Sequence, residues 1–371
     1  MPSRARAISV VILTVVLACV DGTGPAPVVL DQSGRGLAIV ADAHGGLHAA
    51  YRRNGFMYAN CTAPCTGLLP WRENAVEPFD FGDPTIAVDG TGRRHVLFAA
   101  TVGFFLGYET CIASCGTASG WSYTEVEPGP QAPSDGLDVA IAVDGAGHLH
   151  VSHVGPSGLR YSRCDSACST YTNWRTVDLP LVAGGGDYLS QTAIAVDSTG
   201  RVHIAIPTVE MGLRYADCDT ACLSDTSWHF VTVPASAERV SLATSPGGRV
   251  FMVSGPPHMH VGTCATACDV AANWDTVTID PAAFTTPGGF HALAVEPSGR
   301  AHVAYLAADS LVPSQFRIRY AVCDSACNKA ASWRAKTVTT GTEAAITVGV
   351  GGTVHMLFRD NQGAVRYLPI H

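Results

Sequence analysis

The sequence predicts an all-β fold, a seven-bladed β-propeller of four-stranded antiparallel blades, and three observations support this fold class. The pattern Cys, three residues, Cys, five residues, Trp occurs six times, with successive tryptophans roughly 50 residues apart. Upstream of the cysteines, an acidic residue is followed by Gly three positions later and by His three positions after that. Each unit also contains four short β-rich runs separated by turn residues. Repeats of this length are typical of blades, which bury their apolar faces against their neighbours.

The first 18 residues are expected to form a signal peptide. Two arginines precede an apolar run over residues 7–18 that is too short to span a bilayer comfortably. Residues 16–19, Val-Leu-Ala-Cys, resemble a bacterial lipobox and predict lipidation of Cys19, with anchoring to the bacterial envelope. The alternative is an ordinary cleaved signal peptide and a freely secreted protein. A lipid on Cys19 also accounts for the one cysteine outside the repeats.

The last unit contains only three β-rich runs and has neither the cysteine pair nor the Trp. The apolar run Pro27–Asp31, before the first unit, has no partner of its own. We expect this N-terminal strand to complete the last blade, because a ring closed in this way exposes no sheet edge. The predicted domains are therefore a lipoprotein-type signal peptide over residues 1–18, a tether and ring-closing strand over residues 19–35, and the propeller over residues 36–371.

The acidic, Gly and His positions predict a turn between the first two strands of each blade. They are Asp42/Gly45/His48, Asp89/Gly92/His95, Asp144/Gly147/His150, Asp197/Gly200/His203, Ser245/Gly248/Phe251, Glu296/Gly299/His302 and Gly349/Gly352/His355. Equivalent residues of a ring are related by rotation about its axis, so these histidines cannot converge on one metal ion. We expect each His to hydrogen-bond the backbone or the acidic residue of its own turn.

From residue 36 to the end, the repeats resemble bacterial secreted propellers with sialidase-like Asp-box repeats. Those units run apolar-Ala-acidic-x-x-Gly-x-x-His, followed by a strand that carries Tyr. The resemblance implies the fold and extracellular recognition, but related repeats occur in lectins, in hydrolases and in proteins of other roles. The chain departs from the true Asp box, which carries Trp where these units carry His. A sialidase needs three arginines at one site, whereas repeat-equivalent arginines are spread round the ring; these are Arg160, Arg214, Arg319 and Arg366.

The cysteine pairs predict six local disulfides, because two cysteines four residues apart reach bonding distance when the chain between them turns. The pairs are Cys61/Cys65, Cys111/Cys115, Cys164/Cys168, Cys218/Cys222, Cys264/Cys268 and Cys323/Cys327. The alternative is a zinc ion shared by two blades, since a tetrahedral site needs four ligands. We do not expect it, because the outer hairpins of adjacent blades diverge.

One end of every blade carries the blade-to-blade connection and the turn between the second and third strands, and these loops vary between units. Irregular loops on a rigid scaffold are the expected place for specificity. Six residues before the acidic position, near the channel mouth on this face, the units carry Gly36, Asp83, Asp138, Gln191, Arg239, Phe290 and Glu343. With Tyr188 nearby, this set is suited to a hydrated calcium ion or to the hydroxyl groups of a sugar. Solvated loop residues are the alternative interpretation.

No GxSxG, HExxH, phosphate-loop or EF-hand motif occurs in the sequence, so no catalytic residue is predicted and calcium is the one cofactor considered. The net charge of −8 argues against nucleic-acid binding. We expect a noncatalytic cell-surface or secreted protein that binds a carbohydrate or an extracellular protein through the variable loops. The alternative is a carbohydrate-active hydrolase or lyase, which would need two carboxylates at working separation, for example Asp83 with Asp138.

Overall fold

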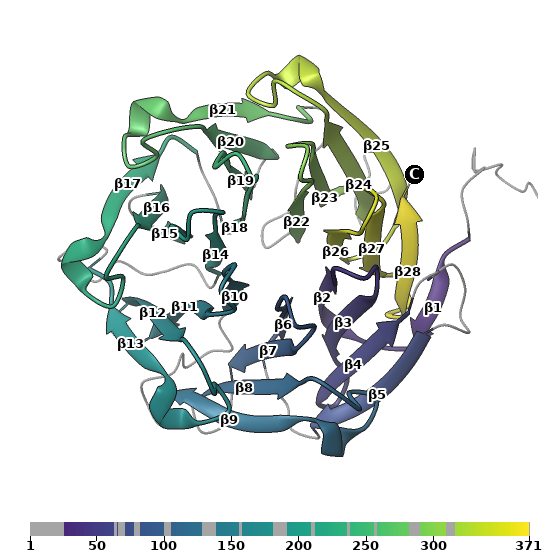
Figure 1. Ribbon diagram of the computed structural model, residues 1–371. Coiled ribbons are helices and arrows are strands. Elements are labelled where there is room, and N and C mark those ends of the chain that lie inside the picture. Colours follow the sequence, from purple (N-terminus) through teal and green to yellow (C-terminus); the bar gives the residue numbers. More distant parts are fainter. Residues whose placement is uncertain are drawn as a thin grey trace, which may run out of the picture.

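The computed structural model describes residues 26–62, 65, 71–77, 82–99, 105–127, 139–155, 158–180, 191–208, 212–235, 238–255, 258–281, 290–308 and 316–370. These residues form seven four-stranded sheets arranged in a ring about a central axis (Figure 1), which confirms the predicted β-propeller. The only helices in these ranges are five single 3₁₀ turns, η1 to η5. The predicted signal peptide and Cys19 lie outside the described residues.

Every blade is an antiparallel sheet, and in blades 1 to 6 the strands follow the chain from the axis outward. The strands of blades 1 to 3 are β2(Arg35–Ala41), β3(Leu47–Arg52), β4(Phe56–Cys61), β5(Trp71–Glu77); β6(Thr85–Val88), β7(Arg94–Ala99), β8(Leu106–Cys111), β9(Ser122–Glu127); and β10(Ala140–Val143), β11(Leu149–Gly155), β12(Gly158–Cys164), β13(Arg175–Asp178). Those of blades 4 to 6 are β14(Ala193–Val196), β15(Val202–Thr208), β16(Gly212–Cys218), β17(His229–Val233); β18(Arg239–Thr244), β19(Val250–Gly255), β20(His260–Cys264), β21(Asp275–Thr278); and β22(His291–Val295), β23(Ala301–Ala308), β24(Phe316–Cys323), β25(Trp333–Thr340). Blade 7 contains β26(Glu343–Val348), β27(Val354–Arg359), β28(Val365–Ile370) and β1(Val28–Asp31).

The ring closes as the sequence predicts. Strand β1 is the outermost strand of blade 7 and pairs antiparallel with β28, where Val28 lies opposite Tyr367 and Val29 opposite Arg366. The N-terminal strand therefore ties the beginning of the chain to its end. It occupies the edge that blade 7 would otherwise leave exposed.

All six predicted disulfides are present, each with a Cα–Cα distance of 5.7 or 5.8 Å, so the zinc alternative is wrong. They join Cys61 to Cys65, Cys111 to Cys115, Cys164 to Cys168, Cys218 to Cys222, Cys264 to Cys268 and Cys323 to Cys327. The prediction treats these residues only as cross-links, and here the structure differs. In five turns the second cysteine is buried and packs in a hydrophobic cluster shared with a neighbouring blade; these residues are Cys65, Cys115, Cys222, Cys268 and Cys327. The second cysteine of each turn therefore contributes to the core as well as to the cross-link.

The disulfide turns share an unusual backbone conformation. In five of them the residue before the second cysteine has a positive φ although it is not Gly; φ is 48° at Ala167, for example. The turn places the following Trp against the preceding blade. Trp174 packs edge-on against Tyr108, with ring centroids 5.3 Å apart, and its Nε1 donates to the Cys168 carbonyl at 2.8 Å.

The repeated histidines have the structural role that we expected, with one partner more. In blade 3 the Asp144 carboxylate accepts hydrogen bonds from two backbone N–H groups of its own turn and lies 3.3 Å from His150 Nε2. On the other side of the ring, His150 Nδ1 lies 2.7 Å from the Tyr161 hydroxyl. Burial lowers the pKa of His150, against the opposing effect of Asp144, so the ring is neutral. Tyr161 therefore donates to the imidazole, which donates to Asp144.

We call this arrangement the relay. The two contacts of the histidine, with the Tyr hydroxyl and with the acidic side chain, recur in blades 1, 2, 4 and 6, with Glu in place of Asp in blade 6. All five relay histidines are buried. A relay of this kind holds the inner turn against the third strand of its blade and satisfies three buried polar side chains at once.

Candidate functional site

The ring has two faces, which the strand order defines. The loop face carries the blade-to-blade connections and the turns between second and third strands; the motif face carries the relay turns and the disulfides. On the loop face, the starts of the first strands surround the axis and line a cavity of about 260 Å³, the axial mouth. The predicted site residues that line it are Gly36, Asp83, Gln191, Arg239, Phe290 and Glu343. The remaining two, Asp138 and Tyr188, lie outside the described residues.

Glu343 binds the neighbouring blade. Its carboxylate accepts the backbone N–H of Gly36 at 3.1 Å and that of Leu37, so the first strand of blade 7 is held to the first strand of blade 1. The side chain is 3% exposed. Burial raises the pKa of Glu343 to about 7, against the lowering effect of the Leu37 N–H, and the negative charge of Asp83 raises it further.

Gln191 has a similar bond between blades 4 and 5. Its Oε1 accepts the backbone N–H of Val240 at 3.2 Å. In both blades a side chain at the predicted position replaces the backbone pairing that adjacent first strands cannot make with each other. Part of the polar character of this ring of positions therefore serves the architecture.

Asp83 and Gly36 lie against each other at the mouth. Gly36 has φ = +64°, and a Cβ atom there would come within 2.4 Å of Asp83 Oδ1, so both the conformation and the space require Gly. Asp83 Oδ1 lies 3.4 Å from Arg52 Nη2, and both side chains are partly exposed. Asp83 is the described carboxylate at the mouth that still faces solvent.

Arg239 and Phe290 form a cation–π pair on the other side of the mouth. The guanidinium carbon lies 4.4 Å from the centre of the Phe290 ring. Both side chains are partly exposed. Next to them, His291 Nδ1 lies 3.0 Å from the Ser241 hydroxyl, and burial lowers the pKa of His291 to about 4. The mouth thus combines an aromatic ring, a cation and a carboxylate, which together can accept the apolar face and the hydroxyl groups of a sugar.

No group of three or more His, Cys, Asp or Glu side chains among the described residues is arranged to hold a metal ion. No helix in the same ranges is long and apolar enough to cross a membrane. The calcium that the sequence suggested therefore has no ligand set within the described part of the mouth.

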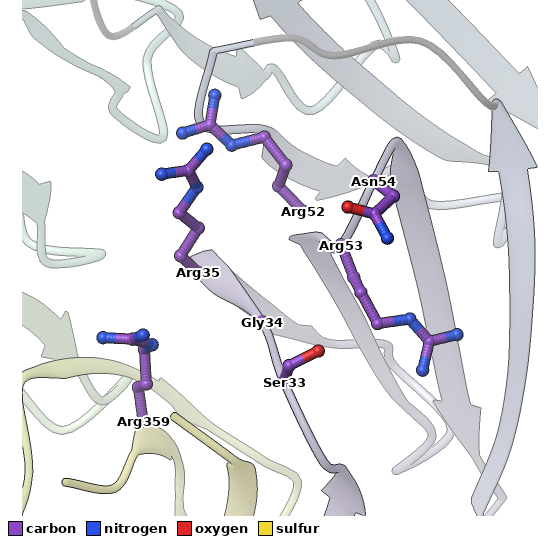
Figure 2. Close-up of a pocket in the computed structure, with 7 residues that line it drawn as sticks. All are labelled: Ser33, Gly34, Arg35, Arg52, Arg53, Asn54 and Arg359. Atoms are coloured by element: carbon purple, nitrogen blue, oxygen red, sulfur yellow. The ribbon is translucent and has the colours of Figure 1, made fainter. Parts of the chain in front are cut away.

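A second cavity on the loop face was not predicted. It measures about 450 Å³, lies between blades 7 and 1 beside the axial mouth, and is lined by Ser33, Gly34, Arg35, Arg52, Arg53, Asn54 and Arg359 (Figure 2). We call it the arginine pocket. Arg52 and Arg359 occupy equivalent positions, four residues after the motif His of blades 1 and 7, and no other blade carries an arginine there. The sequence prediction did not use this pair, and the adjacent Arg52–Arg53 at a hairpin end is the other local hint.

A third cavity lies on the motif face, where the prediction placed no site. It measures about 530 Å³ and lies between blades 5 and 6, with Ser245, Arg249, Phe251 and Asp324 among its lining residues. It adjoins blade 5, which like blade 7 has no acidic residue at the relay position. Both faces of the ring therefore contain cavities, and the axial mouth belongs to the loop face.

Comparison with known proteins supports the architecture. No protein-family model matches the sequence, and no curated protein matches it. Among solved structures, a polysaccharide lyase of family PL25, an ulvan lyase bound to -[GlcA(1-4)Rha3S]-, has a TM-score of 0.59 at 9% identity, over 91% of this chain and 94% of that one. The SapL1 lectin in complex with α-methyl fucoside has a TM-score of 0.51 at 11% identity, over 79% and 93%.

The NanB sialidase from Streptococcus pneumoniae has a TM-score of 0.51 at 11% identity, over 92% of this chain and 69% of that one. At identities this low the likeness extends to the fold and not to individual site residues. The chain is thus similar in fold to a lectin, a sialidase and a polysaccharide lyase.

Proposed function

We propose that this is an exported, noncatalytic binding protein that recognises a carbohydrate through the axial mouth on the loop face. The observation that carries the proposal is the cation–π pair of Arg239 with Phe290 across a small cavity from Asp83. An aromatic ring stacks on the C–H face of a sugar, and charged groups at its side bind hydroxyl groups. The lectin and the carbohydrate-active enzymes among the structural neighbours lend support.

The six disulfides support export, because such bonds persist in oxidising compartments. A lipid on Cys19 would keep the protein at the envelope, with the tether setting its distance from the membrane. Metabolic labelling with a radioactive fatty acid tests the anchor. Label that persists in a Cys19→Ala variant would contradict it.

The alternative, a hydrolase or lyase, has one observation in its favour and one against it. The pKa of Glu343 is about 7, raised by burial and by the charge of Asp83, and a pKa near neutral is typical of a general acid. However, its carboxylate is buried and bonded to two backbone N–H groups of blade 1. Binding therefore explains the site better than catalysis does.

The experiment is a glycan array with soluble residues 20–371, disulfides oxidised and calcium present. We expect binding to one class of sugar, which the Phe290→Ala and Asp83→Asn variants weaken about tenfold or more. Tyr171→Ala is the matched control, because Tyr171 is an exposed aromatic residue in η2(Tyr171–Asn173), on the opposite face. Affinity that survives both mouth substitutions would contradict the proposed site. Breakdown products from an array saccharide would instead favour the enzyme.

A further inference from the structure

The arginine pocket concentrates positive charge on an acidic protein. Its lining comes from three separate segments, the start of β2, the β3–β4 turn and the end of β27 (Figure 2). Four of the seven lining residues are arginines and none is acidic, whereas the whole chain has a net charge of −8. The general composition of the chain therefore does not account for this cluster.

Two of the four arginines are neutralised by carboxylates behind the lining. Arg53 bonds Asp31 at 2.7 Å and Glu73 at 3.1 Å. Figure 2 shows its side chain turned away from those of Arg35 and Arg52. Arg52 bonds Asp83 at 3.4 Å, so it stands between the arginine pocket and the axial mouth. These three ion pairs fix the wall of the pocket.

The other two arginines make no ion pair among the described residues, although the charge of Arg359 acts on the buried Glu343 carboxylate and lowers its pKa. Arg35 is exposed and makes no ion pair with any of them. Arg359 donates to the neutral hydroxyl of Thr342 at 3.2 Å, and its Nε is buried without an acceptor. The Nε is out of reach of a ligand, but Arg359 lines the pocket and its Nη groups carry further N–H donors for a ligand oxygen. The pocket thus presents two guanidinium groups, from blades 1 and 7, that can each take a further acceptor.

The chemistry of guanidinium groups defines the ligand. Several forked N–H donors at one cavity match an oxyanion, which accepts two hydrogen bonds from each fork. The cavity of about 450 Å³ falls in the range of small-molecule sites and has room for more than one anionic group. The ligand is therefore an oxyanion carried on a larger molecule. The neutral groups of Ser33 and Asn54 at the same wall suit the hydroxyl groups of that molecule.

We propose that the arginine pocket binds a sulfate ester or a carboxylate of an acidic glycan, with Arg35 and Arg359 as the principal contacts. The proposal rests on carbohydrate recognition at the axial mouth and specifies the class of glycan. One glycan chain can reach both cavities, because Arg52 lines the arginine pocket, Asp83 lines the axial mouth, and the two residues form an ion pair. The net charge of the protein is negative, so an anionic group of the ligand is attracted by the arginine pocket and repelled by the rest of the surface.

Three polymers test the proposal by biolayer interferometry: dextran sulfate, neutral dextran of the same length, and polygalacturonate. We expect dextran sulfate or polygalacturonate to bind, and which of them does identifies the oxyanion. The double variant Arg35→Gln/Arg359→Gln should bind about tenfold or more weakly. Its melting temperature should change little, since neither arginine makes an ion pair with a described carboxylate and Arg359 acts on the buried Glu343 only through its charge. Arg175→Gln is the control, because Arg175 is an exposed arginine in β13, on the outer edge of blade 3.

The outcomes separate the pocket from the mouth. Equal binding of dextran sulfate by the double variant and the wild type would overturn the pocket, as would an equal loss in Arg175→Gln, which indicates nonspecific attraction. If the double variant loses affinity and Phe290→Ala does not, the pocket stands and the proposed mouth falls. If Phe290→Ala loses binding to a neutral glycan and no acidic polymer binds, the mouth stands and the pocket falls.

Discussion

Blades 3 and 5 have the same strands, the same disulfide turn and different interiors. In blade 3 the buried relay of Asp144, His150 and Tyr161 joins the inner turn to the third strand. In blade 5 the equivalent positions hold Ser245, Phe251 and Val261, and all three are buried. All three polar side chains of the relay have therefore changed together.

The comparison of blades 3 and 5 separates the part of the relay that builds the turn from the part that fills the core. In blade 5, Ser245 Oγ accepts the backbone N–H of Arg249 at 3.2 Å, and the two backbone bonds of the turn are kept. Serine thus replaces the part of the Asp that caps the turn. Because blade 5 has no imidazole at this position, the second carboxylate oxygen of the Asp is not needed. Phe251 and Val261 pack as ordinary apolar residues. Blade 5 thus replaces the whole network, whereas blade 7 keeps the His355–Tyr367 contact with Gly349 at the acidic position.

An Asp, a His and a hydroxyl in hydrogen-bond contact also describes a nucleophile relay, but the relays here are structural. They recur in five blades, and the relay histidines are buried. A Tyr whose hydroxyl lies inside the core has no path to a substrate. Burial also raises the pKa of Tyr161, which is the opposite of activation.

The largest effect should come from breaking one relay. His150→Phe leaves the Tyr161 hydroxyl buried without its partner and removes one of the two histidine contacts of the Asp144 carboxylate, so it should cost about 2–4 kcal/mol of unfolding free energy. Changing all three residues to those of blade 5, Asp144→Ser/His150→Phe/Tyr161→Val, should recover part of that loss. Urea denaturation measures both. A triple variant less stable than the single one would show that the blade 5 solution does not transfer.

The reverse change in blade 5 should cost somewhat less. Phe251→His places an imidazole where one neighbour, Ser245, has no carboxylate and the other, Val261, has no hydroxyl. All three positions are buried. We expect a loss of about 2–3 kcal/mol by urea denaturation. Phe251→Leu, which keeps the site apolar, is the control and should cost less. Equal losses would mean that cavity formation, not polarity, decides this site.

Acid should separate the two kinds of blade. Burial lowers the pKa of the five relay histidines, to about 4 for His95, so below pH 6.5 the unfolded chain binds more protons and stability falls as pH falls toward 4. The full effect is about 3 kcal/mol for a shift of this size. Glu343 and Glu109, whose pKa values burial raises to about 7 and 8, act in the opposite direction over the same range.

The triple variant of blade 3 isolates the histidine effect, because the glutamates are common to both proteins. Its melting temperature should fall less steeply between pH 6.5 and pH 4 than that of the wild type, because it has one fewer histidine with a lowered pKa. Parallel curves would show that the imidazole of His150 does not titrate with unfolding.

The smallest effect concerns what blades 3 and 5 share. Ala167 and Ala267, before the second cysteine of each turn, have φ values of 48° and 49°. Glycine relieves this conformation but gains freedom in the unfolded chain, so Ala167→Gly and Ala267→Gly should each stabilise by about 0.5 kcal/mol. Thermal unfolding measures the shift. A difference between the two variants would show that the departure of blade 5 extends to its disulfide turn.

The features that repeat could be predicted from the amino-acid sequence. The number of blades, the disulfide pairing and the ring-closing strand follow from local patterns, since each depends on residues within one unit or on one missing strand. The sequence also placed Asp83, Arg239 and Phe290 at one mouth, because equivalent positions in a ring face the same axis. It did not reveal the Tyr in each relay, since the hydroxyl reaches the imidazole only across the sheet, between neighbouring strands.

The side-chain contacts between blades could be recognised only from the folded ring. Glu343 was predicted to face a ligand, yet its carboxylate holds Gly36, 307 residues away, because closing the ring leaves two backbone N–H groups there that need an acceptor. The arginine pocket arises for the same reason. Arg35 and Arg359 stand at opposite ends of the chain and share a wall only once β1 has closed the ring. A repeat encodes its own pairing, whereas contacts across the closure depend on residues that do not repeat.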